Sequence, residues 1–251
     1  MNMQDQATAA AMAEARPEGA DAIGELRAQG AIYRLLARFL EQEVDGPLLQ
    51  LLRNGLREPL AEAGVLLEGP LLEDPEGPVL EALAEEYTGL FVAPGGVSPY
   101  LSVFETGCLY REPCDRVMAA YQAAGWDYQR HYSGEFPDHI GTMLGFVGLL
   151  YGVQADALEA GDSQRAEQAA SRRETFLKEL LAPWAPGWCR RAAEAALQPL
   201  YQQVLTLTGR LLWLEINRLV DRRQLRELQK ANLREPRRLD YDADFRKASG
   251  I

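Results

Sequence analysis

The sequence is poor in the residue types that most often carry catalysis or hold a metal. Its 251 residues include only three cysteines and two histidines. Cys108, Cys114 and Cys189 have neither the spacing of zinc ligands nor the pattern of a disulfide framework, so we expect reduced thiols. The phosphate-binding glycine motifs, the HExxH zinc motif and the GxSxG nucleophile motif are all absent. We therefore predict no catalytic residue, cofactor or metal site.

Two further absences bear on location and fold class. The first residues show no basic segment followed by an apolar one, so they do not resemble a secretory signal peptide. We expect residues 1–20 to form a flexible tail and the protein to be cytoplasmic. No stretch of useful length alternates apolar and polar residues as a strand would. The sequence therefore favours an all-α protein.

Basic residues are missing from one long interval. The net charge of −11 argues against nucleic-acid binding. No Lys or Arg lies between Arg57 and Arg111, whereas ten acidic residues do. Residues 221–251 reverse this balance, with nine basic and six acidic residues. The acidic interval fits two interpretations, a solvated surface or a field that attracts a cationic ligand.

Apolar residues recur with the helical period over most of the chain. This pattern predicts a single globular helical domain of about eight to ten helices over residues 21–235, with a connector near 126–137 and a charged tail at 236–251. Asp45 followed by Pro47 is a typical helix start, and Gly125 is a candidate cap at a helix end.

The helix expected from about Pro137 has an unusual composition. No residue between Ile140 and Val153 is charged, so we expect it to be buried on most sides. Fourteen such residues are too few to span a bilayer, which needs about 20. Four glycines fall on one face of this helix: Gly141, Gly145, Gly148 and Gly152. That face either lets a neighbouring helix approach closely or receives a ligand.

Asp138 and His139 stand at the start of that helix. Adjacent helical residues point about 100° apart, so the two cannot form a hydrogen-bonded catalytic pair with each other. A thiol–imidazole pair of His139 with Cys108 or Cys114 is a chemical alternative, but a buried cysteine is more often inert packing. The simplest interpretation is a histidine that caps or braces the helix start.

Two segments resemble one known family. Residues 85–104, EEYTGLFVAPGGVSPYLSVF, are similar to the E-Y-x-x-L-F-x-x-P-G and P-Y-E-S-V-Y region of the TorD-type redox-enzyme maturation chaperones. Residues 134–152, GEFPDHIGTMLGFVGLLYG, are similar to the E-x-P-D-H helix start of that family. Leu101 stands where many relatives have Glu, and Met143 where some do. The helical pattern extends the likeness over roughly residues 25–220.

The resemblance implies a cytosolic chaperone that is not an enzyme. It would bind the twin-arginine signal peptide or the apo form of a molybdenum-cofactor oxidoreductase subunit, assist cofactor insertion and delay export. It implies a monomer or homodimer, with no nucleic-acid partner and no stable membrane insertion. The alternative is an all-α assembly or scaffold subunit that stays in the finished redox complex.

The predicted client-binding residues come mainly from the two motifs. The apolar side chains would take the apolar part of a signal peptide, the carboxylates would take its arginines, and His139 would brace the loop. The predicted set is Tyr87, Leu90, Phe91, Pro94, Pro99, Tyr100, Phe104, Glu135, Asp138 and His139.

Overall fold

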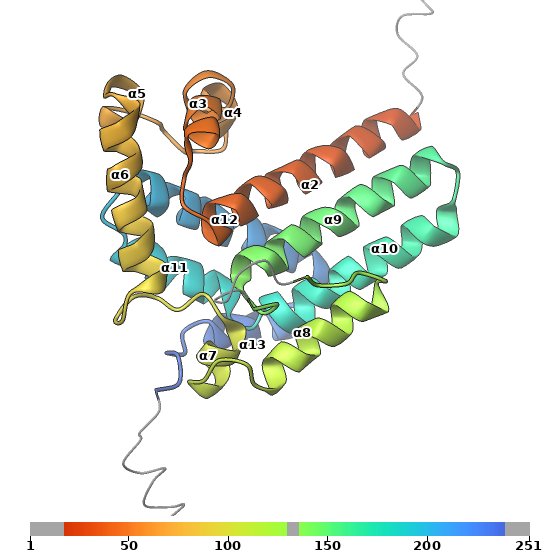
Figure 1. Cartoon of the computed structure of the whole chain (residues 1–251). Coiled ribbons are helices and arrows are strands. Elements are labelled where there is room, and N and C mark those ends of the chain that lie inside the picture. Colours follow the sequence, from red (N-terminus) through yellow and green to blue (C-terminus); the bar gives the residue numbers. More distant parts are fainter. Residues whose placement is uncertain (1–17, 130–135, 239–251) are drawn as a thin grey trace, which may run out of the picture.

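The computed structural model describes residues 18–129 and 136–238 (Figure 1). These residues form twelve α-helices and no strand, which confirms the all-α prediction. The helices are α2 (Glu18–Glu41), α3 (Gly46–Asn54), α4 (Arg57–Glu62), α5 (Pro70–Glu73), α6 (Glu76–Tyr87), α7 (Leu101–Thr106), α8 (Glu112–Ala123), α9 (Ile140–Glu159), α10 (Ser163–Phe176), α11 (Ala185–Ala195), α12 (Pro199–Leu219) and α13 (Arg222–Ala231).

Short helices explain why the described part of the chain holds more helices than the eight to ten expected. The helices α4, α5 and α7 have only four to six residues each, too few for a periodic apolar pattern. The predicted cap signals are confirmed where they are local. The Leu48 N–H donates to Asp45 Oδ1 over 3.0 Å at the start of α3. Gly125, just after α8, has a φ of +73°.

Helices α2 and α9 lie side by side (Figure 1). A Cβ placed on Gly148 would lie 2.9 Å from the Gly30 carbonyl oxygen, and one placed on Gly30 would lie 3.0 Å from the Gly148 carbonyl oxygen. The Arg34 guanidinium also donates to the Gly148 carbonyl over 3.2 Å. The glycine face therefore serves close helix packing, the first of its two interpretations. We call this contact the α2–α9 seam.

Helix α9 begins at Ile140 rather than near Pro137 and has 20 residues. In the part of the chain that the structure describes, it is the one helix long and apolar enough to cross a membrane by length and composition alone. Two thirds of its apolar window is buried inside the fold, with α2 on one side and α10 on another. The composition of α9 is thus that of a core helix.

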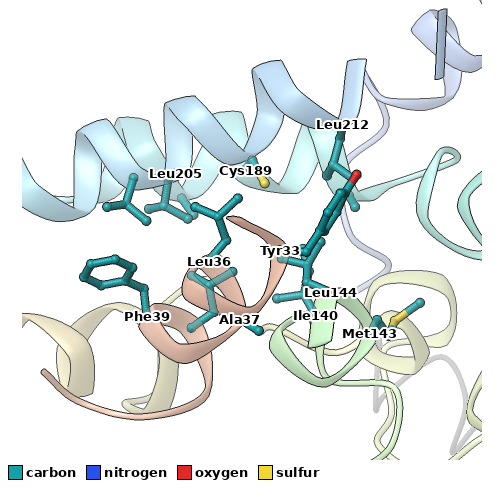
Figure 2. Close-up of a cluster of buried hydrophobic side chains, with 14 of the residues drawn as sticks. Tyr33, Leu36, Ala37, Phe39, Ile140, Met143, Leu144, Cys189, Leu205 and Leu212 are labelled. Carbon is teal, nitrogen blue, oxygen red and sulfur yellow. The ribbon is translucent and has the colours of Figure 1, made fainter. Parts of the chain in front are cut away.

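The core lies where α2, α9, α11 and α12 meet. Figure 2 shows Tyr33, Leu36, Ala37 and Phe39 of α2 with Ile140, Met143 and Leu144 of α9, Cys189 of α11, and Leu205 and Leu212 of α12. Two of the three cysteines are buried. Burial raises the pKa of the Cys114 thiol to about 12, with a further contribution from Asp138, and it also raises the pKa of Cys189. Neither forms a thiolate near neutral pH, in line with inert packing.

Candidate functional site

The two motif segments, far apart in sequence, pair through their backbones. An isolated antiparallel bridge joins Tyr100, just before α7, to His139, just before α9. The Ile140 N–H donates to the Pro99 carbonyl over 2.8 Å as part of this pairing. The bridge fixes the aromatic loop to the start of the core helix, so both motifs contribute to one site.

His139 caps helix α9. Its Nδ1 accepts the Gly141 N–H over 3.1 Å, and its ring meets the Tyr100 ring edge-on with 5.2 Å between centroids. Burial lowers the pKa of His139 to about 4, so the imidazole is neutral at physiological pH. This geometry confirms the interpretation of a histidine that braces a helix start. The other histidine, His131, lies outside the described residues.

Asp138 is fully buried and positions helix α7. Its Oδ2 accepts the Ser102 N–H over 2.7 Å, and its backbone carbonyl accepts the Leu101 N–H over 3.1 Å. The Asp138 carboxylate therefore satisfies the first turn of α7 from the side of α9. In this arrangement it orients the aromatic loop, and contact with a ligand would first require its exposure.

Most of the predicted aromatic residues point into the core. The Tyr87 hydroxyl donates to the Leu40 carbonyl over 3.0 Å, and Phe91 stacks on Trp188 with 5.7 Å between ring centroids. Leu90 is also buried. These contacts place the first motif on α6 and its continuation as part of the core, with only one edge turned outward.

Phe104 is covered by the chain itself. The guanidinium carbons of Arg191 and Arg234 lie 5.3 Å and 5.7 Å from the centre of its ring, and Trp184 packs at 5.7 Å. The Arg237 N–H also donates to the Phe104 carbonyl over 3.0 Å. The start of the C-terminal segment thus runs beside α7, which the sequence pattern did not predict. Leu239, Tyr241 and Phe245 lie outside the described residues.

Part of the predicted set lines a hollow of about 590 Å³, which we call the front groove. Its lining is Arg38, Glu41, Gln42, Glu43, Asp45, Tyr87, Phe91, Val92, Pro99, Tyr100, Leu109, Phe136 and His139. Five predicted residues meet there: Tyr87, Phe91, Pro99, Tyr100 and His139. Leu90, Pro94, Phe104 and Asp138 do not line the front groove. Glu135 lies outside the described residues.

The carboxylates of the front groove come from the junction of α2 and α3. Glu41, Glu43 and Asp45 stand within five residues, a dense acidic signal that the sequence reasoning passed over in favour of the longer acid-only interval. Asp45 forms an ion pair with Arg38, with 2.8 Å between Oδ2 and Nη2. The Leu48 N–H, and then Arg38, lower the pKa of Asp45. The lining thus combines three carboxylates with one guanidinium and a neutral imidazole.

The rim of the front groove carries exposed apolar side chains. Val92 is 66% exposed, Leu109 45%, and the neighbouring Tyr110 68%. A π-helical turn, η1 (Thr88–Val92), continues α6 here, and the Ala93 N–H donates to the Thr88 carbonyl over 2.7 Å. Phe91 thus points inward while Val92 points outward. Apolar residues gathered at a hollow in this way mark an interaction surface more than scattered single ones do.

The described residues contain no group of three or more His, Cys, Asp or Glu side chains that could hold a metal ion. The chemistry of the front groove is instead recognition, since it offers acidic acceptors beside an aromatic wall. Such a surface complements a segment with basic and apolar side chains.

Comparison with known proteins gives a consistent result. Residues 49–190 match the family described as "Nitrate reductase delta subunit". Two curated relatives, from Vibrio vulnificus strains YJ016 and CMCP6, are both named "Chaperone protein TorD". They are 30% and 29% identical to this chain over 163 residues, which is 63% of this chain and 73% of each relative.

Proposed function

The chain belongs to the nitrate reductase delta subunit family, with TorD chaperones among its relatives, and on this premise we propose that it is a cytosolic chaperone for a molybdenum-cofactor oxidoreductase subunit. It binds the subunit's twin-arginine signal peptide, or another cationic and apolar segment of the apo form. It thereby assists cofactor insertion and delays export. The proposal includes no catalytic step.

The observation that carries this proposal is the composition of the front groove. Its carboxylates, Glu41, Glu43 and Asp45, outnumber its one basic residue, Arg38. Beside them stand aromatic side chains and the exposed Val92. A twin-arginine peptide has a basic part followed by an apolar one, so each part has a matching surface. Carboxylates form strong, often bidentate hydrogen bonds with guanidinium groups.

The pairing of the two motifs supports the same proposal. The bridge between Tyr100 and His139 holds the aromatic wall rigid, which lowers the entropic cost of binding. Because His139 is neutral, it adds no positive charge that would repel an arginine. The motif residues therefore build the groove even where, like Asp138, they are buried within its support.

The test is a calorimetric titration of the purified protein with the signal peptide of a twin-arginine molybdoenzyme. The double variant Glu41→Gln/Glu43→Gln should bind more weakly than the wild type, because two groove carboxylates are lost. Glu58→Gln/Glu62→Gln is the matched control, since it removes the same charge from exposed positions on α4 outside the groove. Binding should weaken as salt rises toward molar levels but should persist, since the apolar part is insensitive to screening.

Equal losses in both double variants would indicate a general charge effect and would contradict the assignment of the front groove. Binding of the apo subunit without binding of its signal peptide would keep the chaperone role and remove the peptide role.

A second candidate function is a subunit retained in the mature complex, which the family description as a delta subunit favours. Purification of the mature enzyme separates the two. A retained subunit is recovered with it in fixed stoichiometry, whereas a chaperone is absent.

A further inference from the structure

A second surface has the composition of a binding site but shares no residue with the front groove. Two hollows of about 310 Å³ and 440 Å³ lie along α6, facing the turn between α11 and α12. Both are lined by Ala82 and Gln198, so they form one continuous depression that we call the side groove. In Figure 1, α6 runs along the outer edge of the molecule, with α11 and α12 behind it.

The side groove is apolar inside and exposes leucines at its edges. The larger part of its inner hollow is formed by Leu67, Leu71, Pro78, Val79, Leu83, Pro199 and Leu200. At the edges, Leu66 is 55% exposed and Leu197 is 83% exposed. A chain with a large core leaves such side chains in water at a cost, so their position at one depression indicates a docking surface.

The charges around the side groove all have one sign. Its acidic lining residues are Glu68, Asp74, Glu85 and Glu86. No Lys or Arg lines either hollow. These four belong to the acid-only stretch between Arg57 and Arg111, which contributes no carboxylate to the front groove. The acidic interval thus surrounds a different surface from the one that the motifs build.

Both walls of the side groove are held in place by hydrogen bonds across it. The Leu66 N–H donates to Gln203 Oε1 over 2.5 Å, and Gln203 Nε2 donates back to the Leu66 carbonyl over 2.9 Å. Glu86 Oε1 accepts the backbone N–H groups of Leu197 and Gln198 over 2.5 Å and 3.2 Å. A surface fixed in this way needs little ordering when a ligand arrives.

We propose that the side groove binds an amphipathic segment of another protein, in which bulky apolar side chains stand next to basic residues. The apolar side chains enter the hollow beside Leu83, and the basic residues meet Glu68 and Glu85 at its edge. Charge complementarity selects this occupant, because a neutral segment would leave the acidic edge unused and an acidic one would be repelled. The site goes beyond the proposed function and does not depend on the front groove.

The test uses a fluorescently labelled synthetic helical peptide of leucine, lysine and alanine, with a counterpart in which glutamate replaces lysine. Anisotropy titrations should show binding of the basic peptide and none of the acidic one. Ala82→Trp, which places an indole where the two hollows meet, should weaken binding at least tenfold. Ala61→Trp is the control, since Ala61 is exposed on α4 and lines neither hollow. Leu197→Asp provides a second variant at a highly exposed position, where folding should not be affected.

Two results would overturn this proposal. One is a wild-type protein that does not bind the basic peptide, and the other is folded Ala82→Trp or Leu197→Asp that binds as tightly as Ala61→Trp. The Glu41→Gln/Glu43→Gln variant should bind the basic peptide as the wild type does. If that variant alone loses binding, the peptide occupies the front groove and the side groove is empty. Failure here therefore leaves the proposed function to be judged by its own titration.

Discussion

The α2–α9 seam and the front groove share residues but are built in opposite ways. In the seam, Gly30 and Gly148 let two backbones approach until no side chain fits between them. In the front groove, the ends of the same two helices separate around a hollow lined with side chains. Glu41 ends α2 and His139 caps α9, and both line the groove. The comparison teaches that an open binding surface takes its rigidity from a tightly closed one beside it.

The largest expected effect comes from filling the seam. Gly148→Ala puts a Cβ within 2.9 Å of a backbone carbonyl that cannot rotate away, so we expect a loss of about 3 kcal/mol in the free energy of unfolding. Gly152→Ala is the control, because its nearest neighbour is a guanidinium nitrogen at 3.9 Å. Thermal melts of both should show a clear fall in Tm for Gly148→Ala only. Equal melting temperatures would contradict the close contact.

The next effect concerns the support of the groove. Asp138→Ala leaves the buried Ser102 N–H without its acceptor, which should cost about 2 kcal/mol of stability. Asp138→Asn keeps an acceptor oxygen in the same place and should cost less. Urea unfolding curves give both values. If the two variants unfold alike, the Ser102 contact does not hold α7.

A smaller effect separates the two regions by pH, since the seam has no titrating group comparable with His139. The folded pKa of His139, about 4, lies below its unfolded value of 6.5, so only the unfolded state takes up a proton between them. The contribution of His139 to stability is therefore complete above pH 6.5 and is lost as pH falls. Between pH 6.5 and about 5.5 the loss should be about 1 kcal/mol.

His139→Asn tests this dependence, because asparagine can cap a helix but does not titrate. Its unfolding free energy should fall less than that of the wild type over the same pH range. Parallel curves for the two proteins would show that another group is responsible.

The smallest effect is on the surface of the groove. Glu43 is exposed, so Glu43→Gln should leave Tm unchanged and weaken binding of a cationic peptide by no more than about fivefold. Isothermal titration beside a thermal melt measures both. A fall in Tm as large as that of Gly148→Ala would mean that Glu43 supports the fold and not the groove alone.

The sequence predicted best what depends on neighbours in the chain. The cap at Asp45 and the glycine spacing of α9 are local patterns, and the structure confirms them. The direction of Phe104 depends on Arg191 and Arg234, which come from distant segments, so no local pattern indicates its burial. The same holds for the acidic wall of the groove. Its residues reach Tyr100 only because the seam carries the end of α2 to the start of α9.

The π-helical turn Thr88–Val92 makes the groove depend on the number of residues as well as their type. A π turn holds one residue more than an α-helical turn in the same length. Deleting one residue there would restore a regular helix and rotate everything after it by about 100°. Phe91 and Val92 could then no longer point inward and outward as they do. Relatives that keep both side chains but shorten this turn should therefore lose the groove.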